Sequence, residues 1–282
     1  METSQASTPA AILLCAGYGT RMGALTASTP KPLLPVAGRP MLDYLVDQLT
    51  RFEGLGTLHV VSNHRHIHGF ETWAADHSAR GMRVVVHNDG STSNDDRLGA
   101  IGDLEFVLER LRSGDGDMPD GAFVAAGDNI FCFDLAPLWH AFRNTGKTQV
   151  LALREDDPAK LRRTGVLELD GDRVVRLHEK PTEPPSTWAC PPVYGLSRQA
   201  LERLPSYLAE GHPHDEIGRF IADVVERQTV EAVRIEGERL HVGSPEALRE
   251  ASARMDQLLR QDSLSQDSTD PNNPSNFFRG IL

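Results

Sequence analysis

The stretch AILLCAGYGTRMGALTASTPKPLLPVAGRPML, residues 11–42, predicts a buried strand that ends in a glycine turn. The apolar run 11–15 leads directly into Gly17 and Gly19. In open α/β sheets ligands bind beyond the carboxyl ends of strands, and glycines there let backbone N–H groups approach a phosphate. The spacing matches neither GxGxxG nor GxxxxGK[ST], which excludes a standard dinucleotide loop and a P-loop. The turn is therefore either a different phosphate-binding loop or a plain tight turn.

Two isolated cations follow this turn. Arg21 comes directly after it, and Lys31 stands ten residues later between Pro30 and Pro32. Proline fixes φ and disfavours helix at the residue before it, so we expect an extended segment that aims Lys31 at a set place. A lone lysine is usually only solvated, but the stiffened backbone favours a role in binding an anion.

The composition of the chain narrows the functional classes. The 282 residues carry a net charge of −11, which argues against binding to nucleic acid or to an anionic membrane. The start lacks the features of a signal peptide, and no stretch is long enough to span a membrane. The three cysteines are far apart, which argues against a disulfide framework or a zinc knuckle. We therefore expect a cytoplasmic protein.

Strand and helix patterns alternate through the first half of the chain. This rhythm predicts an α/β fold with a mainly parallel sheet covered by helices on both faces. The expected strands are 11–15, 58–61, 82–87, 121–127 and 148–153, and the expected helices are 41–52, 66–78, 104–112 and 135–144.

The second half has a different pattern. We expect one hairpin over 165–181 turning at Asp170-Gly171, and another over 231–243 turning at Glu236-Gly237. Helices are expected near 197–209 and 214–227, and a last helix is expected from Ser244-Pro245 to about residue 259. Residues 1–10 and 261–282 are expected to be flexible tails.

The opening stretch resembles the signature of the sugar-1-phosphate nucleotidylyltransferases, also called NDP-sugar pyrophosphorylases. The similarity continues in family order through AAGDNIF (125–131), TGVLELDGDRVVRLHEKP (164–181), VYGLSRQAL (193–201) and HVGSPEAL (241–248). It implies a Rossmann-like mixed sheet in a single domain over 11–260. Within that domain it implies a nucleotide-binding part over about 11–150 and a sugar-phosphate part over about 151–260. The implied reaction converts an NTP and a sugar 1-phosphate into an NDP-sugar and pyrophosphate.

The resemblance also assigns roles at the nucleotide end. Arg21 would contact the β- and γ-phosphates, Lys31 would bridge phosphate oxygens near the reacting centre, and Asp128 would hold Mg²⁺. Ser93 and Arg97 could hydrogen-bond the base. The implied nucleotide-binding residues are Ala16, Gly17, Gly19, Thr20, Asn94 and Gly99.

At the sugar end, the resemblance implies that Glu179 accepts hydrogen bonds from sugar hydroxyls and that Lys180 holds the sugar phosphate. Gly165 would let the backbone approach the sugar. The sequence departs from the family where His241 replaces a metal-binding aspartate. Imidazole suits softer ions than Mg²⁺, so His241 is a tentative second ligand and Mn²⁺ an alternative ion.

Two other functions compete with this one. The chain could be a cytidylyltransferase of the same fold that acts on a polyol or amino-alcohol phosphate, or a catalytically silent nucleotide-sugar sensor. An aromatic cage for choline would have to come from Trp188 and Tyr194. The family also implies a homo-oligomer.

Overall fold

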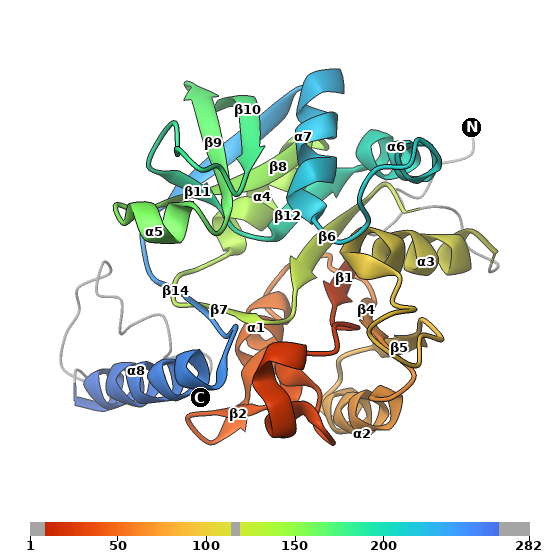
Figure 1. The fold of residues 1–282 in the computed structure, drawn as a ribbon, viewed down its shortest axis with the longest axis vertical. Helices are drawn as coiled ribbons and strands as arrows, with labels where there is room; N and C mark the ends of the chain where they lie inside the picture. Colours follow the sequence, from red (N-terminus) through yellow and green to blue (C-terminus); the bar gives the residue numbers. More distant parts are fainter. Residues whose placement is uncertain (1–8, 114–118, 265–282) are drawn as a thin grey trace.

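A ten-stranded mixed sheet forms the centre of the molecule (Figure 1). The computed structural model describes residues 9–113 and 119–264. The strand order across the sheet is β11-β9-β10-β13-β8-β12-β6-β1-β4-β5. These strands are β1 (Ala10–Leu14), β4 (Leu58–Ser62), β5 (Val84–Asn88), β6 (Gly121–Ala126), β8 (Thr148–Arg154), β9 (Gly165–Asp170), β10 (Arg173–Glu179), β11 (Trp188–Cys190), β12 (Val193–Ser197) and β13 (Val230–Ile235).

The sheet has a parallel half and a largely antiparallel half. β1 pairs in parallel with β6 and β4, and β4 pairs in parallel with β5. β12 then runs antiparallel to both β6 and β8, and β9, β10 and β11 pair with antiparallel neighbours. The mixed α/β sheet implied by the sequence is confirmed. It was expected to be mainly parallel, but parallel pairing is limited to β6-β1-β4-β5 and to β8-β13. The parallel strands bring the carboxyl ends of β6, β1, β4 and β5 to one edge.

Helices cover both faces of this sheet because the buried strands are apolar on both sides. Along β1, Ile12 belongs to one core cluster and Leu13 to the other. The first cluster contains residues from α3 (Gly99–Ser113), α6 (Arg198–Ala209) and α7 (Ile217–Arg227). The second contains residues from α1 (Met41–Leu49), α2 (Ile67–Ser78), α4 (Ala136–Thr145) and the short α5 (Pro158–Leu161).

A third apolar cluster joins distant parts of the chain. Met255 and Leu258 of α8 (Pro245–Leu264) share this cluster with Met22 and Met41. The segments beside it are the 3-10 helices η1 (Thr20–Thr26) and η2 (Lys31–Leu33), and the short strands β2 (Pro35–Val36), β3 (Arg39–Pro40), β7 (Asn129–Phe131) and β14 (Arg239–His241). Thus α8 is packed near the glycine turn although about 230 residues separate them.

The structure corrects two sequence-based expectations about local shape. Residues 165–181 do form a hairpin, but 231–243 do not, because β13 pairs with β8 and β10 while β14 pairs with β7. The expected tails also begin and end elsewhere: β1 starts at Ala10 and α8 continues to Leu264. The remaining residues of both expected tails lie outside the described residues, except Pro9.

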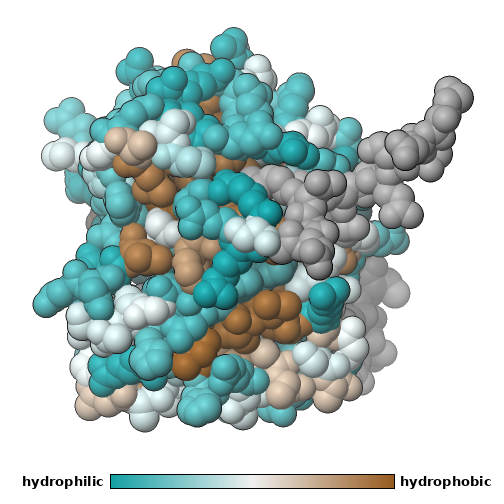
Figure 2. Space-filling model, turned by 90° about the vertical axis from the view of Figure 1, so that its right-hand side faces the viewer, coloured by the Kyte–Doolittle hydropathy of each residue, from teal (hydrophilic) through white to brown (hydrophobic). Residues whose placement is uncertain are grey.

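No helix among the described residues is long and apolar enough to cross a membrane. Figure 2 shows a face that is mostly hydrophilic, with smaller apolar areas of which the most extended lies in the lower half of the view.

Candidate active site

The glycine turn after β1 is shaped by Gly19 and closed by Thr26. Gly19 has φ +59°, a left-handed conformation that glycine adopts without strain. A Cβ on Gly19 would lie 3.0 Å from Thr26 Cγ2. The Thr26 hydroxyl donates a hydrogen bond to the Gly19 carbonyl at 3.1 Å, and the Met22 N–H donates to the same carbonyl at 2.8 Å. The turn is therefore a fixed structure that presents Thr20 and Arg21 at its end.

The start of the turn is held from the neighbouring strand. The buried Asn63, which follows β4, donates its side-chain N–H to the Ala16 carbonyl at 2.8 Å. Neither Asn63 nor Thr26 was singled out from the sequence, because each acts through a contact that a local pattern does not reveal.

Lys31 forms an ion pair with Asp128. Its Nζ lies 2.6 Å from Asp128 Oδ2, and the two side chains are 12% and 25% exposed. The extended conformation expected at Lys31 is wrong, because Lys31 begins the 3-10 helix η2. Pro30 is extended with ψ 145°, and Pro32 fits the first turn because the N–H that it lacks needs no helical partner there. The two prolines thus fix the backbone of Lys31 at the start of a 3-10 helix, and not in an extended segment.

Asp128 stays charged although it is partly buried. Burial favours its neutral form, but the Lys31 ammonium, with His241 and Arg239, outweighs burial and holds the pKa of Asp128 below its usual range. Gly127 allows this arrangement, because a Cβ there would lie 2.4 Å from Cys15 Sγ. The ends of β6 and β1 can therefore meet only with a glycine at this position.

His241 approaches Asp128 from β14. In the β14–β7 ladder His241 lies opposite Asn129, and the Val242 N–H donates to the Asp128 carbonyl at 3.2 Å. His241 Nδ1 is 3.8 Å from Asp128 Oδ2. Burial, together with the nearby cations Lys31, Arg239 and Arg21, lowers the pKa of His241 despite the opposing effect of Asp128. The imidazole is therefore neutral near pH 7, which is the form that can bind a metal ion.

A cavity of about 290 Å³ lies over the carboxyl ends of these strands. Arg21, at its wall, has no ion-pair partner within residues 9–113 and 119–264, so its charge is available to an anion. Leu14, Cys15, Asp103 and Asp215 also line the cavity. Nine of the expected site residues line it: Ala16, Gly17, Gly19, Thr20, Arg21, Lys31, Arg97, Gly99 and Asp128.

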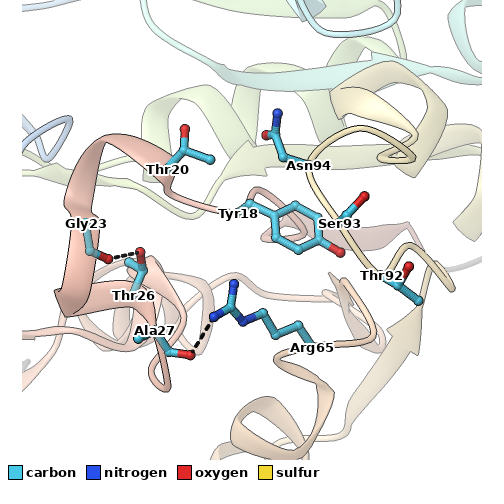
Figure 3. A pocket seen from close by; sticks show the side chains of 9 residues that line it. All are labelled: Tyr18, Thr20, Gly23, Thr26, Ala27, Arg65, Thr92, Ser93 and Asn94. Atoms are coloured by element: carbon cyan, nitrogen blue, oxygen red, sulfur yellow. Dashed lines mark hydrogen bonds between the residues drawn. The ribbon is translucent and has the colours of Figure 1, made fainter.

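Asn94 lies in a second hollow, of about 290 Å³, on the other side of Tyr18 from Arg65 (Figure 3). Its backbone carbonyl accepts a hydrogen bond from Arg97 Nη1 at 2.6 Å. Ser93 donates its hydroxyl to Asp96, and Arg97 forms an ion pair with Asp215 at 2.6 Å. Asn94 and Gly99 thus line neighbouring hollows that share Thr20, and the polar groups of Ser93 and Arg97 are engaged within the protein.

The three residues expected to bind the sugar phosphate form a neighbouring group. Glu179, at the end of β10, lies opposite Gly165, at the start of β9. A Cβ on Gly165 would lie 3.5 Å from Glu179 Oε2, and a Cβ on Gly218 would lie only 1.8 Å from the same oxygen. Gly218, in the first turn of α7, is therefore a further residue on which the position of Glu179 depends. Burial raises the pKa of Glu179, although Lys180 opposes this.

Lys180 is held by carboxylates. Its Nζ lies 2.6 Å from Glu216 and 3.6 Å from Glu179, and its backbone has φ +47°. These carboxylates raise the pKa of Lys180 against the effect of burial. Glu216 precedes α7 and follows Asp215, so one short loop touches both groups of site residues.

The glycine turn, Arg21 at the cavity wall and the lysine–carboxylate pair at the ends of parallel strands define an α/β protein with an anion-binding site of the nucleotide type. The family model described as "Nucleotidyl transferase" matches residues 10–257, and this chain belongs to that family.

Similar proteins agree with this assignment. The mannose-1-phosphate guanylyltransferase of Mycobacterium tuberculosis is 33% identical over 198 residues, which is 69% of this chain and 50% of that protein. The low-salt glycan biosynthesis nucleotidyltransferase Agl11 of Haloferax volcanii is 28% identical over 89% of this chain and 66% of its own length. This chain thus spans about half to two thirds of these curated relatives.

Solved structures share the fold. A UDP-glucose pyrophosphorylase in complex with UDP-glucose aligns over 88% of this chain and 98% of its own, with a TM-score of 0.73 and 19% identity. A structure from Bacillus anthracis aligns over 95% of this chain and 98% of its own, with a TM-score of 0.72 and 23% identity. These likenesses confirm the nucleotidyltransferase type of α/β fold.

Proposed function

We propose that this chain transfers a nucleotidyl group from an NTP to a sugar 1-phosphate and releases pyrophosphate. The observation that carries the proposal is the Lys31–Asp128 pair beside the glycine turn and Arg21, which has no ion-pair partner in the part of the chain that the structure describes. The names of the M. tuberculosis relative and of the UDP-glucose pyrophosphorylase describe enzymes of NDP-sugar formation. The two names specify different bases, so they do not fix the base of the NTP.

The reaction requires two polyanions to meet. A phosphate oxygen of the sugar phosphate attacks the α-phosphorus, and pyrophosphate leaves with the electrons of the broken P–O bond. Two unit charges about 4 Å apart repel by about 4 kcal/mol at an effective dielectric constant near 20. Catalysis therefore consists mainly of positioning and charge stabilisation, and no protein nucleophile is needed.

Each residue has a role that follows from its position. The backbone of Gly17, Gly19 and Thr20 lines the cavity where phosphates would lie. Lys31 stabilises charge at the reacting phosphate, and Arg21 stabilises charge on the leaving pyrophosphate.

The sugar phosphate would bind at the second group of residues. Glu179 accepts hydrogen bonds from the sugar, with Gly165 leaving room beside it, and Lys180 exchanges part of its contact with Glu216 for the sugar phosphate. Asp215 and Glu216 are adjacent, so the loop that holds Lys180 also borders the nucleotide cavity.

A divalent cation fits the first group of residues. Asp128 offers a carboxylate and His241 a neutral imidazole nitrogen, with 3.8 Å between the nearest atoms. Mg²⁺ or Mn²⁺ held there would neutralise phosphate charge, and the remaining ligands would come from phosphate oxygens and water. The Lys31 ammonium shares Asp128 with such an ion, which keeps the negative charge of Asp128 compensated in either case.

The amino-alcohol alternative is weakened by the aromatic residues that it needs. Tyr194 is 2% exposed within the first core cluster, and the Trp188 ring faces the Arg234 guanidinium at 5.6 Å. An aromatic cage for a quaternary ammonium requires open ring faces. A catalytically silent sensor would bind the nucleotide but release no pyrophosphate, so an assay of turnover distinguishes it from the enzyme.

Pyrophosphate release from a matrix of substrates tests the proposal. The five common NTPs are each paired with mannose 1-phosphate, glucose 1-phosphate, N-acetylglucosamine 1-phosphate, ribitol 5-phosphate and phosphocholine. We expect release only with a sugar 1-phosphate, and a loss of about 100-fold or more in Asp128→Asn but not in the exposed control Asp156→Asn. Release with phosphocholine alone, or tight NTP binding without turnover, would contradict the proposal and favour one of its competitors.

A further inference from the structure

An arginine close to Asp128 has no partner in the part of the chain that the structure describes. Arg239 begins β14, and its side chain is half-buried. Within residues 9–113 and 119–264 its guanidinium forms neither a hydrogen bond nor an ion pair. A partly desolvated cation whose N–H donors are unused is unfavourable, so its retention beside a reaction centre indicates that an anion completes it.

The carboxylates nearest to Arg239 are bound to other donors. Asp128 and Glu155 are the carboxylates that act on the Arg239 charge. Asp128 accepts hydrogen bonds at both oxygens, from Lys31 at 2.6 Å and from Asn129 at 2.8 Å. One Glu155 oxygen accepts a backbone N–H at 3.0 Å, and the other lies 3.4 Å from a lysine ammonium. The guanidinium is therefore available to an external anion.

The strand β14 directs Arg239 and His241 to the same side. Side chains alternate along a strand, so these two residues share one face and Leu240 points to the other. Leu240 packs against the third core cluster, and His241 Nδ1 is 3.8 Å from Asp128 Oδ2. At a rise of about 3.3 Å per residue, Arg239 follows His241 on this face at a distance of about 7 Å along the strand.

The partner strand shows which part of the site Arg239 faces. Arg239 lies opposite Phe131 in the β14–β7 ladder, so the two side chains are on the same face. Phe131 packs in the second core cluster with residues on either side of Cys190. Cys190 pairs with Gly165 of the sugar-binding group, and the Arg239 charge also acts on Cys190. Arg239 therefore lies between the Asp128 group and the sugar-binding group.

The phosphate of the acceptor has to reach this same place. It extends from the sugar-binding group to the α-phosphorus beside Lys31, and a phosphate monoester carries about −1.5 to −2 charges at neutral pH. Lys180 meets it as a single ammonium that also holds Glu216 at 2.6 Å. A planar guanidinium can donate two parallel hydrogen bonds to phosphate, which fixes the orientation of the remaining oxygen.

We propose that Arg239 binds the phosphate of the acceptor and orients its attacking oxygen. The inference rests on the proposed function in one respect, since it takes the group of Gly165 and Glu179 as the acceptor site. It goes further by adding a phosphate-binding residue. Because the guanidinium is already unpaired, the phosphate subsite exists before the nucleotide binds.

Steady-state pyrophosphate release tests the role of Arg239 in the reaction. In Arg239→Gln we expect the KM for the sugar 1-phosphate to rise about 10-fold or more, because a hydrogen bond to a charged group is lost. The KM for the NTP should stay close to the wild-type value. Arg239→Lys keeps the charge without the planar donors and should lie between the two. The matched control is Arg249→Gln, at an exposed position on α8 whose guanidinium pairs with Glu246.

Calorimetric titration tests the phosphate subsite without turnover. We expect the full chain to bind glucose 1-phosphate or mannose 1-phosphate in the absence of nucleotide, and inorganic phosphate to compete. Arg239→Gln should weaken this binding about 10-fold or more, and Arg249→Gln should leave it as in wild type. The melting temperature of Arg239→Gln should not fall, because the substitution removes an uncompensated cation.

The possible failures are distinguishable. An acceptor KM that is the same in wild type and Arg239→Gln, or an equal rise in both KM values, would overturn the inference. Weaker binding together with a much lower melting temperature in both Arg239 variants would make the residue structural. The absence of binding to wild type without nucleotide would contradict a preformed subsite. If no substrate pair gives turnover, the proposed function fails, and the titrations alone decide the role of Arg239.

Discussion

Asp103 is a buried carboxyl group whose charged form the surrounding protein disfavours. Its folded-state pKa of about 8 exceeds the usual value, so between about pH 4 and pH 8 the folded chain binds more protons than the unfolded chain. Stability attributable to this group therefore falls as pH rises through that window. Residues that lower stability are typical of functional sites, because activity can require a group that the fold alone would not favour.

Replacing this carboxyl group should stabilise the protein. We expect Asp103→Asn to raise the melting temperature, and by more at pH 8.5 than at pH 5, because the amide has no charged form to bury. Thermal scans of wild type and Asp103→Asn at both pH values measure the effect. Glu109→Gln, an exposed position on the same helix α3, is the matched control and should melt as wild type does. A variant that melts below wild type at pH 8.5 would show that Asp103 supports the fold.

Lys31 should contribute more to catalysis than to folding. It is fixed by η2 and pairs with Asp128, which Asn129 also contacts through a 2.8 Å hydrogen bond. We expect Lys31→Ala to lower the rate of pyrophosphate release about 100-fold or more, with a shift of only a few degrees in melting temperature. The exposed Lys147, paired with Glu231, provides the matched control Lys147→Ala. A large melting shift with little change in rate would make Lys31 a structural residue.

His241 should set the preference for metal ions. A carboxylate at this position would add one negative charge and a harder oxygen ligand beside Asp128, so His241→Asp should lower the Mg²⁺ concentration needed for half-maximal activity. Wild type should in turn be activated relatively better by Mn²⁺. Titrations of both proteins with both ions at pH 8 are the measurement, and superimposable curves for the two proteins would remove His241 from the site.

At the scale of elements, the two outer parallel strands contain a buried histidine pair. His59 of β4 and His87 of β5 lie 2.9 Å apart between Nδ1 and Nε2. Burial, with their mutual repulsion when charged, lowers the pKa of His59 to about 4, and burial lowers that of His87 to about 4. Between about pH 6.5 and pH 4 the unfolded chain binds more protons than the folded chain, so stability is lost as the pH falls through this window.

The acid sensitivity of these strands can be measured. A pKa lowered from 6.5 to about 4 corresponds to about 3 kcal/mol of unfolding free energy for an imidazole. We expect His87→Asn to lose less unfolding free energy than wild type between pH 6.5 and pH 4.5. Urea unfolding at several pH values is the measurement. His140→Asn, on the exposed side of α4, should leave the slope as in wild type, and identical slopes for all three proteins would exclude the pair as the cause.

Elements with a strong local pattern were predictable from sequence. The hairpin at Asp170-Gly171 formed as expected because the turn and both strands are adjacent in the chain. The turn signal at Glu236-Gly237 was just as clear, but β13 and β14 find better partners in β8 and β7. Strand pairing over long sequence separations is decided by burial in the whole sheet, which a local pattern does not contain.

The candidate site divides in the same way. The glycine turn, Arg21 and Lys31 stood out because they follow a recognisable strand, and the family resemblance added Ala16, Gly99 and Asp128. Gly218 and Asp103 were not, because the first is defined by Glu179, 39 positions earlier, and the second by an unpaired atom in the folded chain. Asn94 was placed with Gly99 by the family resemblance, and in the structure it lines a neighbouring hollow that shares Thr20 with the cavity.

At the scale of the whole molecule, local charge matters more than net charge. The chain carries −11 overall, yet Lys31 and Arg239 lie near Asp128 at the strand ends, and Arg21 lies near His241. Short distances and partial burial make these local interactions stronger than the screened field of distant carboxylates. The third core cluster also fixes this region, because Met255 of α8 packs in the same cluster as Met22 beside Arg21.

Cys15, where the ends of β1 and β6 meet, can report by its thiol reactivity whether this part of the fold opens. Cys15, which fills the space that a side chain at position 127 would need, is buried, as are Cys132 and Cys190. Burial raises the pKa of all three thiols, that of Cys132 to about 12, and only a thiolate reacts readily with a disulfide reagent. We expect Ellman's reagent to label the native chain slowly, and to titrate all three thiols at once in denaturant. A thiol that reacts rapidly in native buffer would show that its site opens while the rest of the chain stays folded. Mass spectrometry would identify the labelled cysteine and therefore the site that opens.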